Sequence, residues 1–125
     1  MPLSTEDRLA IQDLAARYNT AIDSGNADAW AATFTPDGTF ESGGRAHQGT
    51  EALAAFAKSF AERMAGARHW NNNLVIDGDG DQATLGCYLL LWKGGQIVTS
   101  ARYEDTLRRI NGEWRFASRR VVPDA

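Results

Sequence analysis

The sequence predicts an α+β fold in which one strongly curved antiparallel sheet wraps around helices from the N-terminal half. Residues 4–24 and 50–66 repeat apolar side chains at the spacing of an amphipathic helix. From residue 67 onward the apolar residues alternate with period two, as in strands with one buried face. Glycine-containing hairpin turns separate the alternating segments at 78–80, 94–95 and 111–112. Helices followed by an antiparallel meander indicate a single α+β domain, residues 1–125.

The first helix is expected at about residues 4–24. Ser4 is a suitable N-cap, and Asp7 lies in the first turn, where a negative charge is favourable. Gly25 follows the last apolar residue of the pattern and is a natural helix stop. Asp23 therefore lies in the last turn, where the partial negative charge of the helix end disfavours a carboxylate. Asp23 is either an exposed acid tolerated at small cost or a carboxylate that orients a partner.

Short elements are expected between this helix and the alternating half of the chain. In order, they are a helix at residues 27–34, a turn at 35–38, a small hairpin of 39–41 with 46–48, and a helix at 50–66. Trp30 and Phe34 would form the inward side of the short helix. Thr50 would cap the third helix, and Gly66 would end it.

Four strands are expected in the second half, at residues 68–77, 82–93, 96–110 and 113–122. The first of them is unusually polar, with one histidine and three asparagines where a core strand would have valine or isoleucine. A buried polar group without a partner costs about 1–3 kcal/mol, so a polar strand face needs partners or a function. At period two, His69, Asn71 and Asn73 share one face with Val75, unless a bulge changes the alternation. The opposite face would carry Trp70, Leu74 and Ile76.

Composition limits the classes of partner and the cellular setting. The formal charge of −3 and the pI near 5.3 argue against nucleic-acid binding, which depends on neutralising phosphates. Cys87 is the one cysteine, so no disulfide can form within the chain, and a reducing cytoplasm is the expected location. We expect Cys87 to be a buried structural thiol. The longest apolar run, residues 87–92, is far too short to span a membrane.

No metal or cofactor site is expected. The sequence has no H-x-x-x-H or C-x-x-C spacing and no glycine-rich nucleotide motif. Residues 77–81 resemble the start of a calcium loop, but position twelve of such a loop would be Tyr88 instead of glutamate. A hairpin turn explains these residues better.

His69 and Asp23 are the candidate acid–base pair. A free histidine has a pKa of about 6.5 and can accept a proton at cellular pH. A carboxylate on the second ring nitrogen fixes the tautomer and stabilises the imidazolium. No serine or cysteine has a convincing nucleophile setting, so general-base proton abstraction is the simpler chemistry. Tyr103 reaches a pocket or closes the core, and Arg119 is either an anion-holding group or a solvated strand arginine.

Several segments together resemble one known family. They are residues 10–14 with Tyr18 and Asp23, then 30–34, 37–38, Gly49, 68–73, 103–105 and 112–116. The chain resembles the SnoaL-like branch of the nuclear-transport-factor-two-like superfamily, which includes ketosteroid isomerase, scytalone dehydratase, polyketide cyclases and lindane dehydrochlorinase. The resemblance implies a cone-shaped, cystatin-like α+β barrel. It also implies a homodimer or homotrimer formed through the sheet.

The resemblance also implies roles for single residues. A strand histidine and an aspartate at the end of helix one form the acid–base pair of the dehydratase and dehydrochlorinase members, and they match His69 and Asp23. The dehydrochlorinase's arginine on the final strand matches Arg119. Its helix-one lysine, which helps to hold the leaving halide, is replaced by Tyr18, and this departure favours dehydration over dehydrohalogenation.

The sequence thus predicts a cofactor-free acid–base enzyme that dehydrates or isomerises a small hydrophobic carbonyl or hydroxy compound. His69 would be the base and Asp23 its orienting acid, with Tyr18 or Arg119 stabilising the negative charge that develops. The expected cavity lining also includes Trp30, Phe34, Phe56, Phe60, Asn71, Tyr88 and Tyr103. The alternative is a non-catalytic ligand-binding or assembly module, whose interface would be formed by outward apolar residues such as Leu89, Leu91 and Val98.

Overall fold

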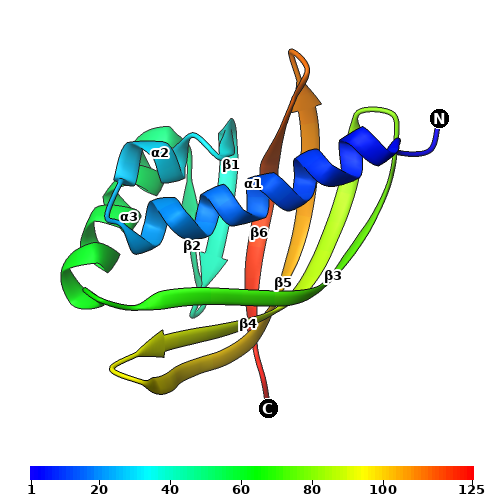
Figure 1. The fold of residues 1–125 in the computed structure, drawn as a ribbon. Coiled ribbons are helices and arrows are strands. Elements are labelled where there is room, and N and C mark those ends of the chain that lie inside the picture. The colour runs from blue at the N-terminus through cyan, green and yellow to red at the C-terminus, as the bar shows by residue number, and fades with distance from the viewer.

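Three helices and six strands make up the computed structural model, which describes residues 1–125 (Figure 1). In chain order they are α1 (Thr5–Asp23), α2 (Ala27–Ala31), β1 (Phe34–Ser42), β2 (Arg45–Gln48), α3 (Thr50–Arg63), β3 (Arg68–Asp79), β4 (Gln82–Lys93), β5 (Gln96–Ile110) and β6 (Glu113–Pro123). All six strands belong to one sheet, with the order β2-β1-β6-β5-β4-β3.

The sheet is curved, and its strands bend around the long helix α1 (Figure 1). Strands β3 to β6 form the predicted antiparallel meander. Helices α2 and α3 lie together beside the β1–β2 hairpin. The predicted α+β class with a curved sheet around N-terminal helices is confirmed. One neighbouring pair, β1 with β6, is parallel, and it connects the N-terminal hairpin to the last strand of the meander.

The start of α1 is fixed by a capping box that also anchors the helix to the sheet. The Ser4 hydroxyl accepts a hydrogen bond from the Asp7 backbone N–H at 3.0 Å, and Asp7 accepts one from the Ser4 N–H at 3.2 Å. Asp7 Oδ1 also accepts from Trp114 Nε1 at 3.0 Å and from Arg109 Nη1 at 2.8 Å. These hydrogen bonds lower the pKa of Asp7. The bond from the Trp114 indole has the largest effect, and the bond from the Ser4 backbone has the next largest.

The second helix is shorter than predicted, and the predicted turn lies within a strand. Helix α2 ends at Ala31, and Phe34 begins β1. The pairing of β1 with β6 shifts between Phe34 and Thr39, so residues 35–38 form an irregularity inside the strand. The turn-forming sequence is thus used as a bulge. The third helix also starts differently, because its N-cap is Gly49, with φ of 88°, and Thr50 is its first residue.

Strand β3 contains a bulge that reverses its predicted faces. Asn73 has a positive φ of 58°, a conformation that asparagine tolerates better than most residues, and the pairing with β4 shifts between Asn72 and Val75. Beyond the bulge, Leu74 packs against the core and Ile76 is buried. Val75 is 56% exposed. The predicted grouping of Asn73 and Val75 with His69, and of Leu74 and Ile76 with Trp70, is therefore wrong.

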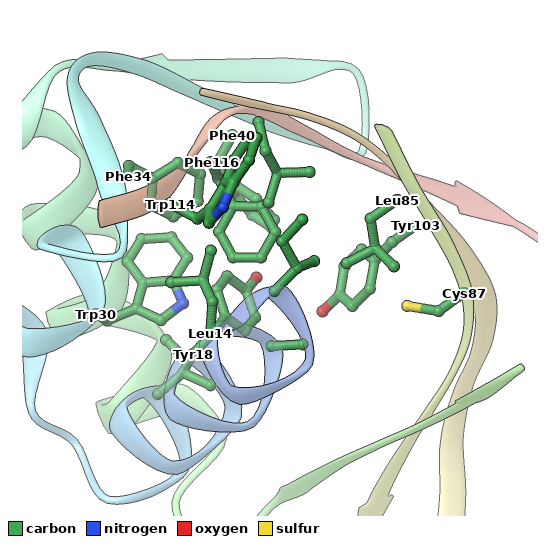
Figure 2. Packing of buried hydrophobic residues seen from close by; sticks show 14 of the residues in the cluster. Leu14, Tyr18, Trp30, Phe34, Phe40, Leu85, Cys87, Tyr103, Trp114 and Phe116 are labelled. Atoms are coloured by element: carbon green, nitrogen blue, oxygen red, sulfur yellow. The ribbon is translucent and has the colours of Figure 1, made fainter. Parts of the chain in front are cut away.

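Aromatic rings dominate the core between α1, α2 and the sheet (Figure 2). The rings of Trp30 and Phe34 lie 5.0 Å apart and those of Tyr18 and Phe116 5.6 Å apart, measured between centroids. Cys87 is buried, as predicted, and burial raises the pKa of its thiol to about 11.

Strand β4 presents alternate leucines to the core. Leu89 and Leu91 are buried on the inner face of the sheet, so the expectation that they point outward is wrong. Of the three residues proposed for an assembly surface, Val98 alone is exposed, at 50%.

Arg119 is buried completely inside the molecule, and it pairs with Asp105. Its Nε and Nη2 donate to the two carboxylate oxygens at 2.9 and 3.0 Å, and both side chains are 0% exposed. The guanidinium carbon lies 3.6 Å from the ring centroid of Tyr103 and 4.4 Å from those of Tyr18 and Phe116. Burial opposes the charge of Arg119, but the charge and hydrogen bonds of Asp105 raise the pKa of Arg119.

Replacing Arg119 by methionine should destabilise the fold by about 3–5 kcal/mol, because Asp105 would remain as a buried, unpaired carboxylate. The double variant Arg119→Met/Asp105→Leu should recover most of this loss, since it removes both charges. Urea unfolding of the wild type, both single variants and the double variant measures the coupling. A loss below about 1 kcal/mol for Arg119→Met, the range of a surface pair, would contradict this assignment.

Gly38 should not accept a side chain, because an added Cβ would lie 2.8 Å from Phe34 Cβ and 2.9 Å from the Thr35 carbonyl oxygen. We expect Gly38→Ala to lower the free energy of unfolding by about 1–3 kcal/mol. Gly86→Ala is the matched control, since the nearest atom to its added Cβ is 3.9 Å away. That control should change stability by no more than about 0.5 kcal/mol. Equal effects of the two substitutions would show that close packing at Gly38 is not the cause.

Candidate active site

Asp23 and His69 form a hydrogen-bonded pair between the end of α1 and the start of β3. Asp23 Oδ1 lies 2.7 Å from His69 Nδ1. The backbone N–H of His69 also donates to both carboxylate oxygens, at 3.2 Å to Oδ1 and 3.0 Å to Oδ2. The side chains are 8% exposed for His69 and 20% exposed for Asp23. With Nδ1 engaged by the carboxylate, Nε2 is the ring nitrogen that remains for a ligand.

The chain holds this carboxylate at a position that a helix by itself disfavours. Asp23 is the last residue of α1, and no basic residue lies in the last turn to offset the partial negative charge there. The donors come from β3, which passes the helix end. Of the two interpretations of Asp23 in the sequence, an exposed acid or an orienting carboxylate, the geometry fits the second.

A cavity of about 750 Å³ lies beside this pair. It is enclosed by α1, α3, the β1–β2 hairpin and the inner face of β4 to β6, and His69 is part of its wall. Its other walls are mainly apolar, with Phe56 and Phe60 from α3 and Leu89 and Leu91 from β4. Such a lining fits a small, mostly hydrophobic ligand.

Two tyrosines form the deep end of the cavity. Tyr18 and Tyr103 both line it, although each of these residues is only 1% exposed. Their rings lie 5.9 Å apart, and their hydroxyl groups point toward each other (Figure 2). Burial raises the pKa of Tyr18, an effect that Arg119 partly offsets, and burial together with Tyr18 raises the pKa of Tyr103 further. Both phenols therefore remain protonated at neutral pH and can donate hydrogen bonds.

The structure brings together five of the predicted site residues on the cavity surface and places the others elsewhere. The five are Tyr18, Phe56, Phe60, His69 and Tyr103. Asp23 lies directly behind His69. Arg119 lies beneath the two tyrosines, paired with Asp105, and so it does not face a ligand as expected.

Four other residues expected in the lining lie outside the cavity. Trp30 and Phe34 are buried in the aromatic core behind it, with exposures of 0% and 1%. Asn71 is held by structural hydrogen bonds, since its Oδ1 accepts from Asn19 Nδ2 at 2.7 Å and its Nδ2 donates to the Tyr88 carbonyl at 3.1 Å. Tyr88 is 57% exposed, because its position on β4 alternates with the buried leucines.

Six polar residues in the lining were not identified as site residues from the sequence. They are Ser42 from β1, Arg45 and His47 from β2, Ser59 and Arg63 from α3, and Thr99 from β5. Period two places Arg45 and His47 on one face of β2, and the spacing of four places Ser59 and Arg63 on one face of α3. The sequence shows both spacings. It does not show which face of β2 or α3 borders a cavity, because that depends on how α3 packs against the hairpin.

No group of three or more His, Cys, Asp or Glu side chains is arranged to hold a metal ion. None of the helices is both long enough and apolar enough to cross a bilayer.

Comparisons with known proteins agree with this architecture. A protein of unknown function from Nostoc punctiforme with a cystatin-like fold is 31% identical, with a TM-score of 0.92 over 99% of this chain and 96% of that chain. A Novosphingobium aromaticivorans protein, provisionally described as an aromatic ring hydroxylase, is 28% identical, with a TM-score of 0.88 over 98% and 92% of the two chains.

A second Novosphingobium aromaticivorans protein, provisionally described as a scytalone dehydratase, is 21% identical and shares the fold, with a TM-score of 0.83 over 94% and 84% of the two chains. Comparison with curated proteins gives no significant match. The model of the SnoaL-like domain family matches residues 4–120, and the chain therefore belongs to the SnoaL-like family.

Proposed function

We propose that this protein is a cofactor-free acid–base enzyme that dehydrates or isomerises a small hydrophobic carbonyl or hydroxy compound. The observation that carries the proposal is the 2.7 Å contact between Asp23 and His69 at the wall of an apolar cavity. A structural histidine needs no carboxylate on its ring and no access to a cavity. His69 has both, and this arrangement is the one required of a general base.

The pair supports proton abstraction by the nitrogen that Asp23 leaves unoccupied. The carboxylate accepts a hydrogen bond from Nδ1–H, so Nε2 carries a lone pair toward the ligand. When Nε2 takes a proton from the carbon beside a carbonyl group, Asp23 stabilises the imidazolium that forms. The contacts from the backbone N–H hold the carboxylate in place during this step.

Negative charge moves to the substrate oxygen in the same step, and Tyr18 and Tyr103 are placed to donate hydrogen bonds to it. Arg119 supports them from behind, where its charge lowers the pKa of Tyr18 relative to burial alone. Loss of a β-hydroxyl group as water completes a dehydration, with the proton returned from the imidazolium. Return of the proton to a different carbon completes an isomerisation.

A dehydratase description of one distant relative fits this reaction class, since elimination of water requires proton transfer and no cofactor. At 21% identity that relative shares the fold, and the argument for this chain rests on its own Asp–His pair and cavity.

Asp23→Asn should leave the fold intact and lower activity roughly 100- to 10,000-fold. The asparagine amide would donate to Nδ1, so the ring proton would move to Nε2 and block the base. The assay is hydrogen–deuterium exchange and elimination, followed by NMR, on a panel of aryl ketones and β-hydroxy ketones. Asp13→Asn, on the exposed part of the same helix, is the matched control and should retain full activity.

His69→Gln should lower activity in this assay at least as much as Asp23→Asn does. Full activity of either His69→Gln or Asp23→Asn would rule out the mechanism. If the wild type bound members of the panel without exchanging or eliminating any of them, the chain would instead be a non-catalytic ligand-binding module.

We also propose that the chain forms a homodimer or homotrimer through the outer face of the sheet. Trp70, Tyr88, Ile97 and Val98 are each at least half exposed there, and the Trp70 and Trp92 rings lie 5.4 Å apart. Exposed apolar residues gathered on one face favour association. Sedimentation analysis should show an oligomer that Trp70→Lys/Val98→Lys converts to monomer. A monomeric wild type at micromolar concentration would contradict this proposal.

A further inference from the structure

The charged residues of the cavity are all basic, although the chain as a whole is acidic. Acidic residues number 16 and the net charge is −3, yet no aspartate or glutamate is part of the cavity surface. Arg45 and Arg63 are the permanent cations in the lining. They come from different elements, β2 and the last residue of α3, which pack against each other.

These two arginines differ from most others in the chain because neither is neutralised. Arginines elsewhere pair with carboxylates, as Arg102 does with Glu104, Arg108 with Asp37 and Arg109 with Asp7. No carboxylate lies within ion-pair distance of Arg45 or Arg63. Two unpaired guanidinium groups at one cavity attract an anion.

Arg63 is held along the cavity wall. Its Nε donates to Ser59 Oγ at 3.2 Å, and its guanidinium lies 6.0 Å from the ring centroid of Phe60. Ser59 and Phe60 line the same cavity. The side chain thus follows the surface that a ligand would touch, and its remaining N–H groups are available for a planar anion.

Exposure separates the cavity into two ends. Arg45 and Arg63 are exposed at the mouth, whereas Tyr18 and Tyr103 are 1% exposed at the deep end. A carboxylate at the deep end would lose its hydration with the two phenols as its nearest donors, because Arg119 beneath them is already neutralised by Asp105, and this loss is costly. At the mouth it would meet two guanidinium groups and keep some water.

We infer that the substrate is an amphiphilic anion, a compound with an apolar, ring-sized body and a carboxylate or similar acidic group. This inference rests on the proposed function for the site that it extends. The acidic group binds between Arg45 and Arg63 at the mouth. The apolar body lies against Phe56, Phe60 and the leucines of β4, which directs the reacting carbon toward His69.

Equilibrium binding of two matched probes tests the inference without turnover. The probes are 2-naphthoate and 2-naphthamide, which share one ring system and differ in charge, and calorimetry gives both dissociation constants. The wild type should bind the carboxylate roughly tenfold more tightly than the amide. Arg45→Gln/Arg63→Gln should remove this preference and leave the amide affinity unchanged, and that unchanged affinity also shows that the variant is folded.

Lys58→Gln is the matched control, because it removes an exposed positive charge from the same helix outside the cavity lining. It should keep the preference. Equal affinities of the two probes in the wild type, no binding of 2-naphthoate, or a preference that survives in the double arginine variant would each overturn the inference.

The same titration of Asp23→Asn separates this inference from the proposed reaction. That variant keeps both arginines, so its preference for 2-naphthoate should equal that of the wild type. A protein that prefers the anion but catalyses no exchange would refute the reaction and support the anion site. A protein that catalyses exchange without this preference would refute the anion site alone.

Discussion

The hydrogen bonds between Asp23 and His69 join the helical part of the molecule to the sheet at the proposed catalytic site. One carboxylate accepts from the backbone N–H and from the ring of the same residue, so it fixes both the path of β3 and the orientation of the imidazole. The helix end provides no favourable charge for this carboxylate, and the strand supplies its donors. Helix α1, strand β3 and the cavity wall therefore depend on the same contact.

A second buried charge supports the other side of the cavity. Arg119 is neutralised by Asp105 and enclosed by the rings of Tyr18, Tyr103 and Phe116, so it joins α1 to β5 and β6 beneath the cavity. Its cost of burial is offset only because the pair is bidentate and the ring faces surround it. The buried Arg119–Asp105 pair thus lies directly beneath the two protonated phenols, whereas the walls of the cavity are mainly apolar.

Local rules predicted the parts of this arrangement that depend on nearby residues. The capping box at Ser4, the helix stop at Gly25 and the hairpin glycines defined the elements, and they placed Asp23 in the last turn of its helix. Histidine chemistry and family resemblance then selected His69 as the partner.

The remaining features depend on contacts between elements, which no local sequence pattern determines. One extra residue at the bulge near Asn73 reversed the faces of β3, because strand alternation changes completely with a shift of one. The burial of Arg119 followed from Asp105 on the neighbouring strand, and alternation alone gave no preference between exposed and buried. Arg45 and Arg63 met at one cavity only through the packing of α3 against the hairpin.

The position of the proton on the His69 ring is the most direct test of the claim that His69 is the general base, because a base requires an unprotonated Nε2 that faces the cavity. Nitrogen-15 NMR of the histidine ring at mildly alkaline pH measures it. In the wild type we predict the tautomer with the proton on Nδ1, and in Asp23→Asn a change to the tautomer with the proton on Nε2. A wild-type ring protonated on Nε2 alone, or a ring indifferent to the Asp23 substitution, would contradict the account.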